Sequence, residues 1–273
     1  MPDVLALRLS GPLQSWGAAT RHNTRGTLTH PTKSGVIGLC AAALGRPRGA
    51  DLSDLAALRF GVRVDQPGTL LTDFHTMSAA SHGPLEPKAQ KLPTADGGRL
   101  KPGEGKISRR YYLQDAVFVA AFAGEGEEER ALLREVEAAL RRPRYPLFLG
   151  RRSCPPDRPV LIGLLNETRL LDALASGIEW QSWRRRRDEN AMPREPLAIV
   201  VDAAADHPIE GVRAEREHEE LLPDQPEGGR ASNPTFSQRL VRHRHAALSF
   251  TAEQSDALFD GDDAMSLLDR AEG

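Results

Sequence analysis

The sequence is poor in the residues and patterns that mark several large classes of protein. It holds two cysteines in 273 residues, and neither lies in a CxxC or CxH pattern, so we expect neither a disulfide framework nor a zinc site. Its longest apolar run, residues 116–123, is too short to cross a bilayer, and its first residues lack the basic and apolar regions of a signal peptide. These absences predict a soluble cytoplasmic protein with no membrane partner, no metal and no other cofactor.

The chain also lacks the net positive charge that would indicate a nucleic-acid partner, because its formal net charge is −2. The charge is nevertheless distributed unevenly. It amounts to +7 over residues 1–112, −5 over residues 113–140, +6 over residues 141–194 and −10 over residues 195–273. The two basic segments predict a local basic face of the kind that phosphate binding needs, and a random surface distribution explains the same numbers equally well.

Hydrophobic patterning and turn residues predict a mixed α+β order of elements. Helical signals occur at residues 35–44, between possible caps at Thr32 or Ser34 and a stop at Gly45, and at residues 127–141, which carry an apolar stripe. Short apolar or alternating runs predict strands at residues 4–9, 58–64, 115–122, 146–149, 160–165 and 195–202. The order β-α-β-insert-β-α-β is that of a ferredoxin-like or RRM domain.

Two parts of the chain depart from this plan. Residues 67–110 are rich in Gly, Pro, Lys and Arg and are too long for an ordinary connection inside a compact domain, so we expect a projecting arm or a disordered insert. After residue 202 we expect an acidic, loop-rich segment, a further apolar segment over residues 238–250, and an acidic tail.

Two motifs near the N-terminus combine turn-forming residues with groups that can contact a nucleotide. In LSGPLQSWG (Leu9–Gly17), Gln14 could hydrogen-bond a base and Trp16 could stack on one, although filling the core beneath the loop is the favoured interpretation of Trp16. Lys33 stands at the predicted helix N-terminus, where free N–H groups and the helix dipole suit a phosphate. An ordinary cap with a solvated lysine is an equal alternative there.

The segment RYPLFLGRRSCPP, residues 144–156, has the most specific pattern. A glycine permits close backbone approach, paired arginines can fork onto phosphate oxygens, and a hydroxyl and an aromatic ring add hydrogen-bonding and stacking groups. These binding candidates are Tyr145, Gly150, Arg151, Arg152 and Ser153. A second basic run, residues 183–187, is a weaker candidate because such runs are most often solvated loops.

In their order and spacing, these segments resemble the CasD family, the subunit of type I-E Cascade complexes that caps the 5′ handle of CRISPR RNA. The matching strings are LSGPLQSWG, PTKSGVIGL, DFHT, YLQDAVF and PRYPLFLGRRSCPP. Together they cover residues 1–165, whereas the remaining third of the chain matches poorly.

The resemblance implies an α+β, RRM-like (RAMP-type) domain over residues 1–165 with a protruding β-hairpin thumb at about residues 74–112. A smaller β-rich extension over residues 166–250 and an acidic tail over residues 251–273 would follow. It also implies contacts with the guide RNA, with the CasC backbone and CasA large subunits, and indirectly with target DNA. Carried over onto this sequence, the handle-binding candidates are Gln14, Trp16, Lys33, Arg109, Arg110, Gly150, Arg151, Arg152 and Ser153.

The resemblance leaves catalysis to be decided, because the related type I-C branch cleaves precursor RNA without a metal. Such cleavage needs a base for the 2′-OH and a cation for the transition state. Of the eight histidines, His30 lies near Lys33 and His75 lies in DFHT, but no Tyr-Lys-His set or carboxylate cluster emerges from the sequence. In type I-E systems a separate CasE subunit cuts. We therefore predict a non-catalytic subunit, with a metal-independent endoribonuclease or an unrelated RRM-like binding protein as alternatives.

Overall fold

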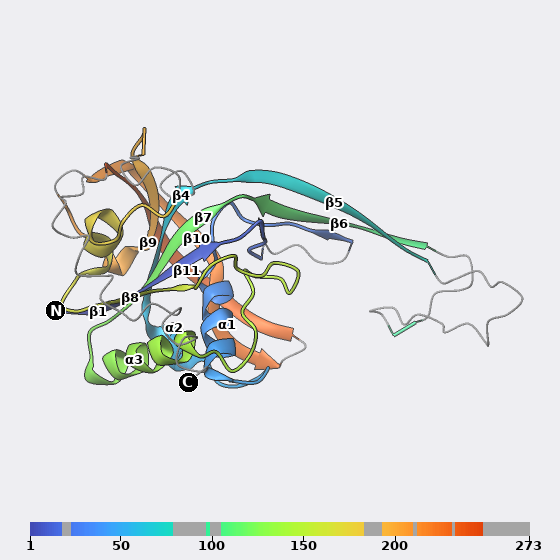
Figure 1. The fold of residues 1–273 in the computed structure, drawn as a ribbon, viewed down its shortest axis with the longest axis horizontal. Helices are drawn as coiled ribbons and strands as arrows, with labels where there is room; N and C mark the ends of the chain where they lie inside the picture. The colour runs from blue at the N-terminus through green and yellow to red at the C-terminus, as the bar shows by residue number, and fades with distance from the viewer. Residues whose placement is uncertain are drawn as a thin grey trace, which may run out of the picture.

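The structure is a computed structural model that describes residues 1–17, 23–78, 97–98, 105–182, 193–209, 212–230 and 233–247 (Figure 1). Its elements are β1 (Asp3–Ser10), β2 (Leu13–Gln14), β3 (Thr24–Arg25), α1 (Lys33–Leu44), α2 (Ser53–Ala57), β4 (Arg59–Gln66), β5 (Thr69–Ser78), β6 (Gly105–Gln114), β7 (Val117–Gly124), α3 (Glu127–Arg141), β8 (Leu161–Leu165), α4 (Leu170–Asp172), the π-helix η1 (Ala173–Gly177), β9 (Leu197–Asp202), the 3-10 helix η2 (Ala203–Ala205), β10 (Val212–Arg230) and β11 (Asn233–Ala246).

A seven-stranded sheet in the order β10-β11-β9-β4-β7-β1-β8 forms the body of the molecule. Strands β4, β7, β1 and β8 are each antiparallel to their neighbours. One face of these strands packs with α1 and α3 in a core that includes Phe60, Phe118 and Leu133. On the other face, side chains of these strands and Ile199 of the neighbouring strand β9 pack against α4 and η1, through Leu171 and Leu174. Because β7 is buried along its whole length, its sequence is a continuous apolar run rather than an alternating one.

The two long helices form where the sequence predicts them. Thr32 caps α1 by accepting a hydrogen bond from the Gly35 N–H at 3.2 Å, and Gly45 ends the helix in a left-handed conformation with φ +77°. In α3 the Glu129 carboxylate accepts from the Gly126 N–H, and the apolar stripe faces the core. Among the described helices, none has the length and apolar character needed to cross a membrane.

Strands β5 and β6 form a two-stranded arm that leaves the body (Figure 1). The arm register runs from Thr69 opposite Gln114 to Ser78 opposite Gly105, so the hairpin starts earlier and ends later than the predicted limits of residues 74–112. It places the exposed side chains of Leu70, Phe74 and Ile107 on one face. The opposite face carries Asp73, His75 and Arg110. We call β5 and β6 the arm.

Two predictions about secondary structure are wrong. Residues 146–149 are not a strand but a loop, in which Leu149 is fully buried. The acidic segment expected to be loop-rich instead contains β10, which pairs along β11. Its carboxylates find partners on the basic neighbouring strand: Glu219 pairs with Arg242 at 2.7 Å, and Glu220 with His243 at 3.0 Å. The acidic tail lies outside the described residues.

Candidate nucleic-acid interface

The loop over residues 144–156 is built around Gly150. The Leu149 N–H donates to the Cys154 carbonyl at 2.7 Å, and the Ser15 N–H donates to the Leu149 carbonyl at 3.2 Å. Gly150 has φ +85°, and a Cβ added to it would lie 1.9 Å from the Ser15 carbonyl oxygen. The glycine was predicted to admit a ligand, but the group that approaches it is the chain's own backbone. Gly150 therefore shapes the loop and does not itself offer a binding surface.

Arg151 joins this loop to two other segments. Its guanidinium donates to the carbonyls of Tyr111, Arg25 and Gly26 at 3.3, 3.0 and 3.3 Å. It also lies over the Tyr112 ring, with Cζ 4.9 Å from the ring centroid. Arg151 therefore fixes the position of the loop against β3 and the base of the arm.

The two residues that follow Arg151 lie at the surface of the loop. Arg152 and Ser153 are exposed, and the Ser153 Oγ lies 3.4 Å from the Tyr112 phenol. Burial raises the pKa of Tyr112, but hydrogen bonds from Ser153, Arg151 and Arg110 outweigh burial, so its pKa lies below the ordinary value. Two of these three hydrogen-bonding partners are guanidinium groups, so the phenol lies among cations.

Backbone pairing brings further arginines to the same place. Strand β3 runs parallel to β6 and sets Arg25 beside Arg110. Arg109 lies on the other face of the arm, 5.9 Å from the centroid of the exposed Phe74 ring. The Arg110 Nε is buried and has no hydrogen-bond partner within the described part of the chain. We define the arm-base cluster as Arg25, Arg109, Arg110, Arg151 and Arg152.

Two members of this region were not among the predicted site residues. Arg25 lies in a polar loop without a motif, and only its pairing with β6 reveals its place. Phe74 was part of the string DFHT, yet nothing in that string distinguishes an exposed aromatic from a core one. Alternation along β5, combined with the cationic neighbour opposite, is the signal that could have found it.

Gln14 and Trp16 lie in the core and do not belong to the interface. Both are fully buried. The Gln14 amide donates to the carbonyls of Leu9 and Ala116, at 3.0 and 2.7 Å, and its Oε1 accepts from the Trp16 Nε1 at 3.1 Å. Their polar atoms are therefore satisfied internally, so neither side chain is exposed for the predicted RNA contact, and the position of Trp16 agrees with its core-filling interpretation.

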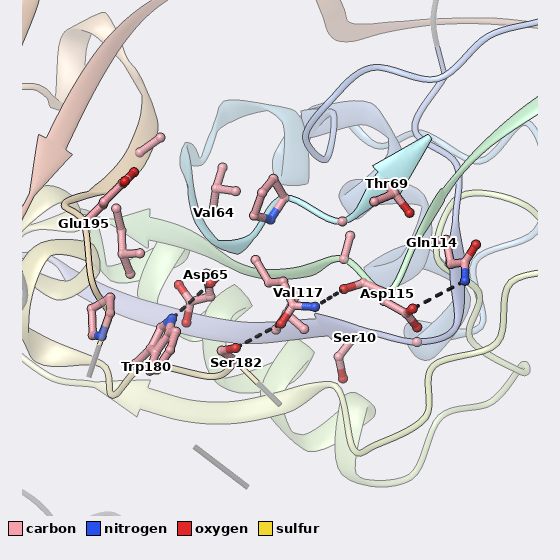
Figure 2. Close-up of a pocket in the computed structure, with 18 of the residues that line it drawn as sticks. Ser10, Val64, Asp65, Thr69, Gln114, Asp115, Val117, Trp180, Ser182 and Glu195 are labelled. Atoms are coloured by element: carbon pink, nitrogen blue, oxygen red, sulfur yellow. Dashed lines mark hydrogen bonds between the residues drawn. The ribbon is translucent and has the colours of Figure 1, made fainter. Parts of the chain in front are cut away.

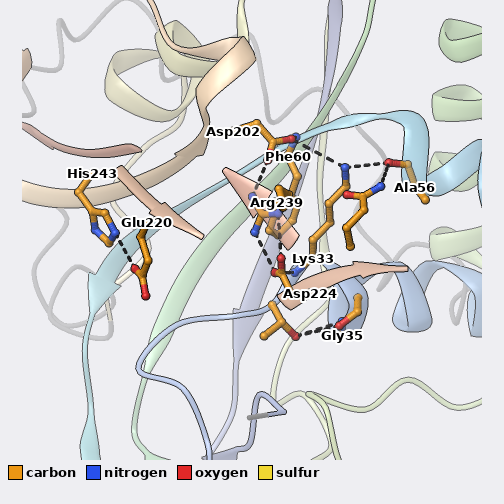
Figure 3. Close-up of polar contacts among 12 residues, drawn as sticks. Lys33, Gly35, Ala56, Phe60, Asp202, Glu220, Asp224, Arg239 and His243 are labelled. Atoms are coloured by element: carbon orange, nitrogen blue, oxygen red, sulfur yellow. Dashed lines mark hydrogen bonds and ion pairs between the residues drawn. The ribbon is translucent and has the colours of Figure 1, made fainter. Parts of the chain in front are cut away.

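Lys33 is also buried, and the predicted phosphate seat at the α1 N-terminus is filled by a carboxylate (Figure 3). The Lys33 N–H donates to Asp224 Oδ2 at 2.7 Å. The Lys33 ammonium donates to the Ala56 carbonyl at 2.8 Å and lies 3.8 Å from Asp202. Burial lowers the pKa of Lys33 to about 8, with Asp202 opposing that shift. The positive end of the α1 dipole therefore faces the Asp224 carboxylate, and the Lys33 ammonium is not exposed for the predicted RNA contact.

Arg239 completes this buried network and ties β11 to the body. It donates to both oxygens of Asp224 at 2.9 and 2.8 Å and to Asp202 at 2.5 Å. Its guanidinium also lies 5.4 Å from the centroid of the Phe60 ring. Two buried cations and two buried carboxylates therefore compensate one another between α1, β9, β10 and β11.

Two predicted binding segments do not belong to the arm-base cluster: Tyr145 and the basic run at residues 183–187. Tyr145 is 46% exposed, and its N–H donates to the Ala42 carbonyl in the last turn of α1 at 3.2 Å. Its ring is therefore accessible at the C-terminal end of that helix. Residues 183–187 lie outside the described residues.

A groove of about 1380 Å³ lies at the base of the arm, between the strand ends and the residues that precede β9 (Figure 2). Thr69 and Gln114, where the arm begins and ends, line it together with Trp180 and Leu197. Its carboxylates are Asp65, Asp115, Asp157 and Glu195, against one described cation, Arg194. Phosphate binding therefore favours the arm-base cluster over the groove.

The two histidines considered as bases differ in their surroundings. His30 is 8% exposed, and burial, aided by His243, lowers its pKa to about 4. His75 is part-exposed on the arm and is hydrogen-bonded to Asp73, on the same face as Arg110. In the described part of the chain, no group of three or more His, Cys, Asp or Glu residues could hold a metal ion.

Comparisons with known proteins give consistent relatives. Residues 4–234 match the model of the family described as CRISPR-associated protein (Cas_Cas5). The CRISPR system Cascade subunit CasD of Escherichia coli (strain K12) is 37% identical over 175 residues, which are 60% of this chain and 71% of that protein. A crystal structure of a Cas protein is similar, with a TM-score of 0.62 and 36% identity over 89% of this chain and 95% of that chain. A chain of a CRISPR RNA-guided surveillance complex has a TM-score of 0.64 and 28% identity, over 92% and 95%.

Replacing Arg239 by Met should destabilise the protein by about 3–5 kcal/mol, because Asp224 would stay buried without its salt-bridge partner and Asp202 would keep only Lys33. Arg242→Met is the matched control, since Arg242 lies on the same strand but its side chain is 37% exposed. Chemical denaturation followed by circular dichroism measures both variants. Equal losses for the two substitutions would contradict a buried, stabilising network.

His30 should make the protein less stable as the pH falls from 6.5 to 4. The unfolded chain takes up a proton near the ordinary pKa of 6.5, whereas the folded chain resists it until about pH 4, so acid favours unfolding by up to about 3 kcal/mol. The free energy of unfolding, measured across this pH range, should depend less on pH in His30→Gln. His75→Gln, on the part-exposed arm, is the control. Parallel pH profiles for wild type and His30→Gln would refute this assignment.

Proposed function

The chain belongs to the Cas5 family of CRISPR-associated proteins, as its resemblance to CasD implied, and we propose that it is a non-catalytic RNA-binding subunit of a Cascade surveillance complex. Its role would be to cap the 5′ handle of the guide RNA and to bridge the CasC backbone and CasA large subunits in the cytoplasm, meeting target DNA only indirectly. The named role of the 37% identical relative and the surveillance complex among the similar structures support this proposal.

We assign the first part of the chain to the ferredoxin-like, RRM-type (RAMP) fold. The strand order β8-β1-β7-β4, with α1 and α3 in one core on the same face, supports this assignment. The arm would be the thumb, inserted between β4 and β7 of a domain over residues 1–165. Strands β9, β10 and β11 would form the β-rich extension over residues 166–250.

The arm-base cluster carries the proposal that this chain binds RNA. Arg25, Arg109 and Arg152 are exposed cations at the root of a projecting hairpin, and the buried Arg110 Nε lacks a protein partner among the described residues. Guanidinium groups pair with phosphate oxygens through two parallel hydrogen bonds. Phe74 beside Arg109 adds an exposed ring on which an unstacked base can lie.

The remaining predicted residues take supporting roles in this proposal. Arg151 orients the loop and adds positive charge, Gly150 permits the turn, and the exposed Ser153 hydroxyl offers a hydrogen bond to phosphate. Tyr145 is kept as a stacking residue, since its ring is 46% exposed. Gln14, Trp16 and Lys33 support the interface from within the core.

The arginines should contribute phosphate contacts, and the salt dependence of binding measures them directly. Arg25→Ala combined with Arg152→Ala should reduce the slope of log K against log salt for a single-stranded repeat RNA by about 1–2 units. Arg141→Ala with Arg142→Ala removes the same charge from exposed positions at the end of α3 and should leave the slope unchanged. Equal effects of the two pairs would mean that binding does not use the arm-base cluster.

The competing function, a metal-independent endoribonuclease, is supported by His75 lying on the same arm face as Arg110. We expect purified protein to leave a labelled repeat RNA intact, with or without EDTA, because the 37% identical relative is named as a Cascade subunit and not as a nuclease. A single specific cut that persists in EDTA and disappears in His75→Ala would favour the nuclease instead.

A further inference from the structure

The C-terminal part of the sequence carries a concentration of negative charge that the proposed function does not use. Residues 248–273 contain seven Asp or Glu against one Arg. This segment has a net charge of −6 and the whole chain has a formal net charge of −2, so residues 1–247 have a net positive charge. The acidic tail, residues 251–273, holds all of these charges; the structure describes the chain up to Ala247.

The described chain ends close to the base of the arm. Ala246, the last residue of β11, pairs with Leu197 at the start of β9. Leu197 lines the same groove as Thr69 and Gln114, the residues at which the arm strands begin and end (Figure 2). Gln114 lies four positions after Arg110 along β6, which is about 13 Å.

The chain that follows Ala247 is long enough to reach the arm-base cluster. A chain of this many residues can span at most about 90 Å. The cluster therefore lies well within its reach.

Charge complementarity selects the surface that suits the acidic tail. The groove beside the exit point carries Asp115, Asp157 and Glu195, which would repel it. The arm-base cluster presents exposed guanidinium groups at Arg25, Arg109 and Arg152. Carboxylates pair with guanidinium groups in the same forked geometry as phosphates do. The features that suit the cluster to RNA therefore suit it equally to an Asp-rich segment of the same chain.

We propose that the acidic tail occupies the arm-base cluster in the guide-free protein and that RNA displaces it. This inference rests on the proposed function, since it takes the cluster to be the RNA site. An intramolecular competitor lowers the apparent affinity for every RNA by the fraction of free cluster. Because ion pairs between exposed groups are screened by salt, the competition is strongest at low ionic strength.

The test compares the full chain with a chain that ends at Ala247 in binding to a labelled single-stranded repeat RNA. Removing the acidic tail should tighten binding by about five- to tenfold at 50 mM salt, and the difference should disappear at high salt. The shortened chain should also show the steeper salt dependence, since RNA then meets a cluster neutralised only by small ions. Equal affinities at all salt concentrations would overturn the inference.

A matched pair of substitutions separates local competition from a general change in net charge. Asp260→Asn, Asp262→Asn and Asp263→Asn together change the tail by three charges, and Glu127→Gln, Glu128→Gln and Glu135→Gln change exposed positions of α3 by the same amount. The tail variant should bind RNA about two- to threefold tighter and the α3 variant should not. Equal tightening would mean a long-range charge effect and would refute occupancy of the cluster.

Adding Arg25→Ala and Arg152→Ala to both chain lengths distinguishes this inference from the function on which it rests. If the arginine substitutions weaken RNA binding but tail removal has no effect, the cluster is the RNA site and the tail inference fails alone. If the arginine substitutions have no effect in either length, the proposed RNA site fails as well. In the expected outcome, removal of the tail strengthens binding only while these arginines are present.

Discussion

The contact of Arg151 with three backbone carbonyls determines how the interface is arranged. One guanidinium connects the 144–156 loop, the short strand β3 and the base of the arm, three segments that are distant in sequence. Hydrogen bonds to a charged donor are stronger than neutral ones, and a planar fork fixes direction as well as distance. Gly150 supplies the turn that brings this arginine into place, because a side chain there would collide with Ser15.

The buried cations of the interior have carboxylate partners, whereas the arginines at the arm base contact carbonyl oxygens and aromatic rings. Lys33 and Arg239 are buried against Asp202 and Asp224, so their charge is cancelled where water is absent. At the arm base, Arg151 contacts carbonyl oxygens and an aromatic ring, and Arg109 contacts Phe74. Such partners orient a cation without neutralising it. Positive potential therefore survives at the surface from which the arm projects, even though the chain as a whole is slightly acidic.

The sequence predicts local structure well and long-range burial poorly. Caps at Thr32 and Gly45 and the apolar stripe of α3 define both long helices, because their signals lie within a few residues. Whether Lys33 is a solvated ligand or a buried partner depends on Asp224, which is 191 residues away. Strand β10 was missed for the same reason: its carboxylates look like loop residues until the cations of β11 lie beside them.

The arm is a two-stranded ribbon, and strand alternation decides which side chains share each of its faces. Among its ten paired positions, Phe74 lies opposite Arg109 on one face and Asp73 lies opposite Arg110 on the other. Inserting or deleting a single residue near the root of one strand would turn every following side chain of that strand to the opposite face. During divergence the arm can therefore lengthen or shorten in steps of two residues, while odd steps would mix the two surfaces.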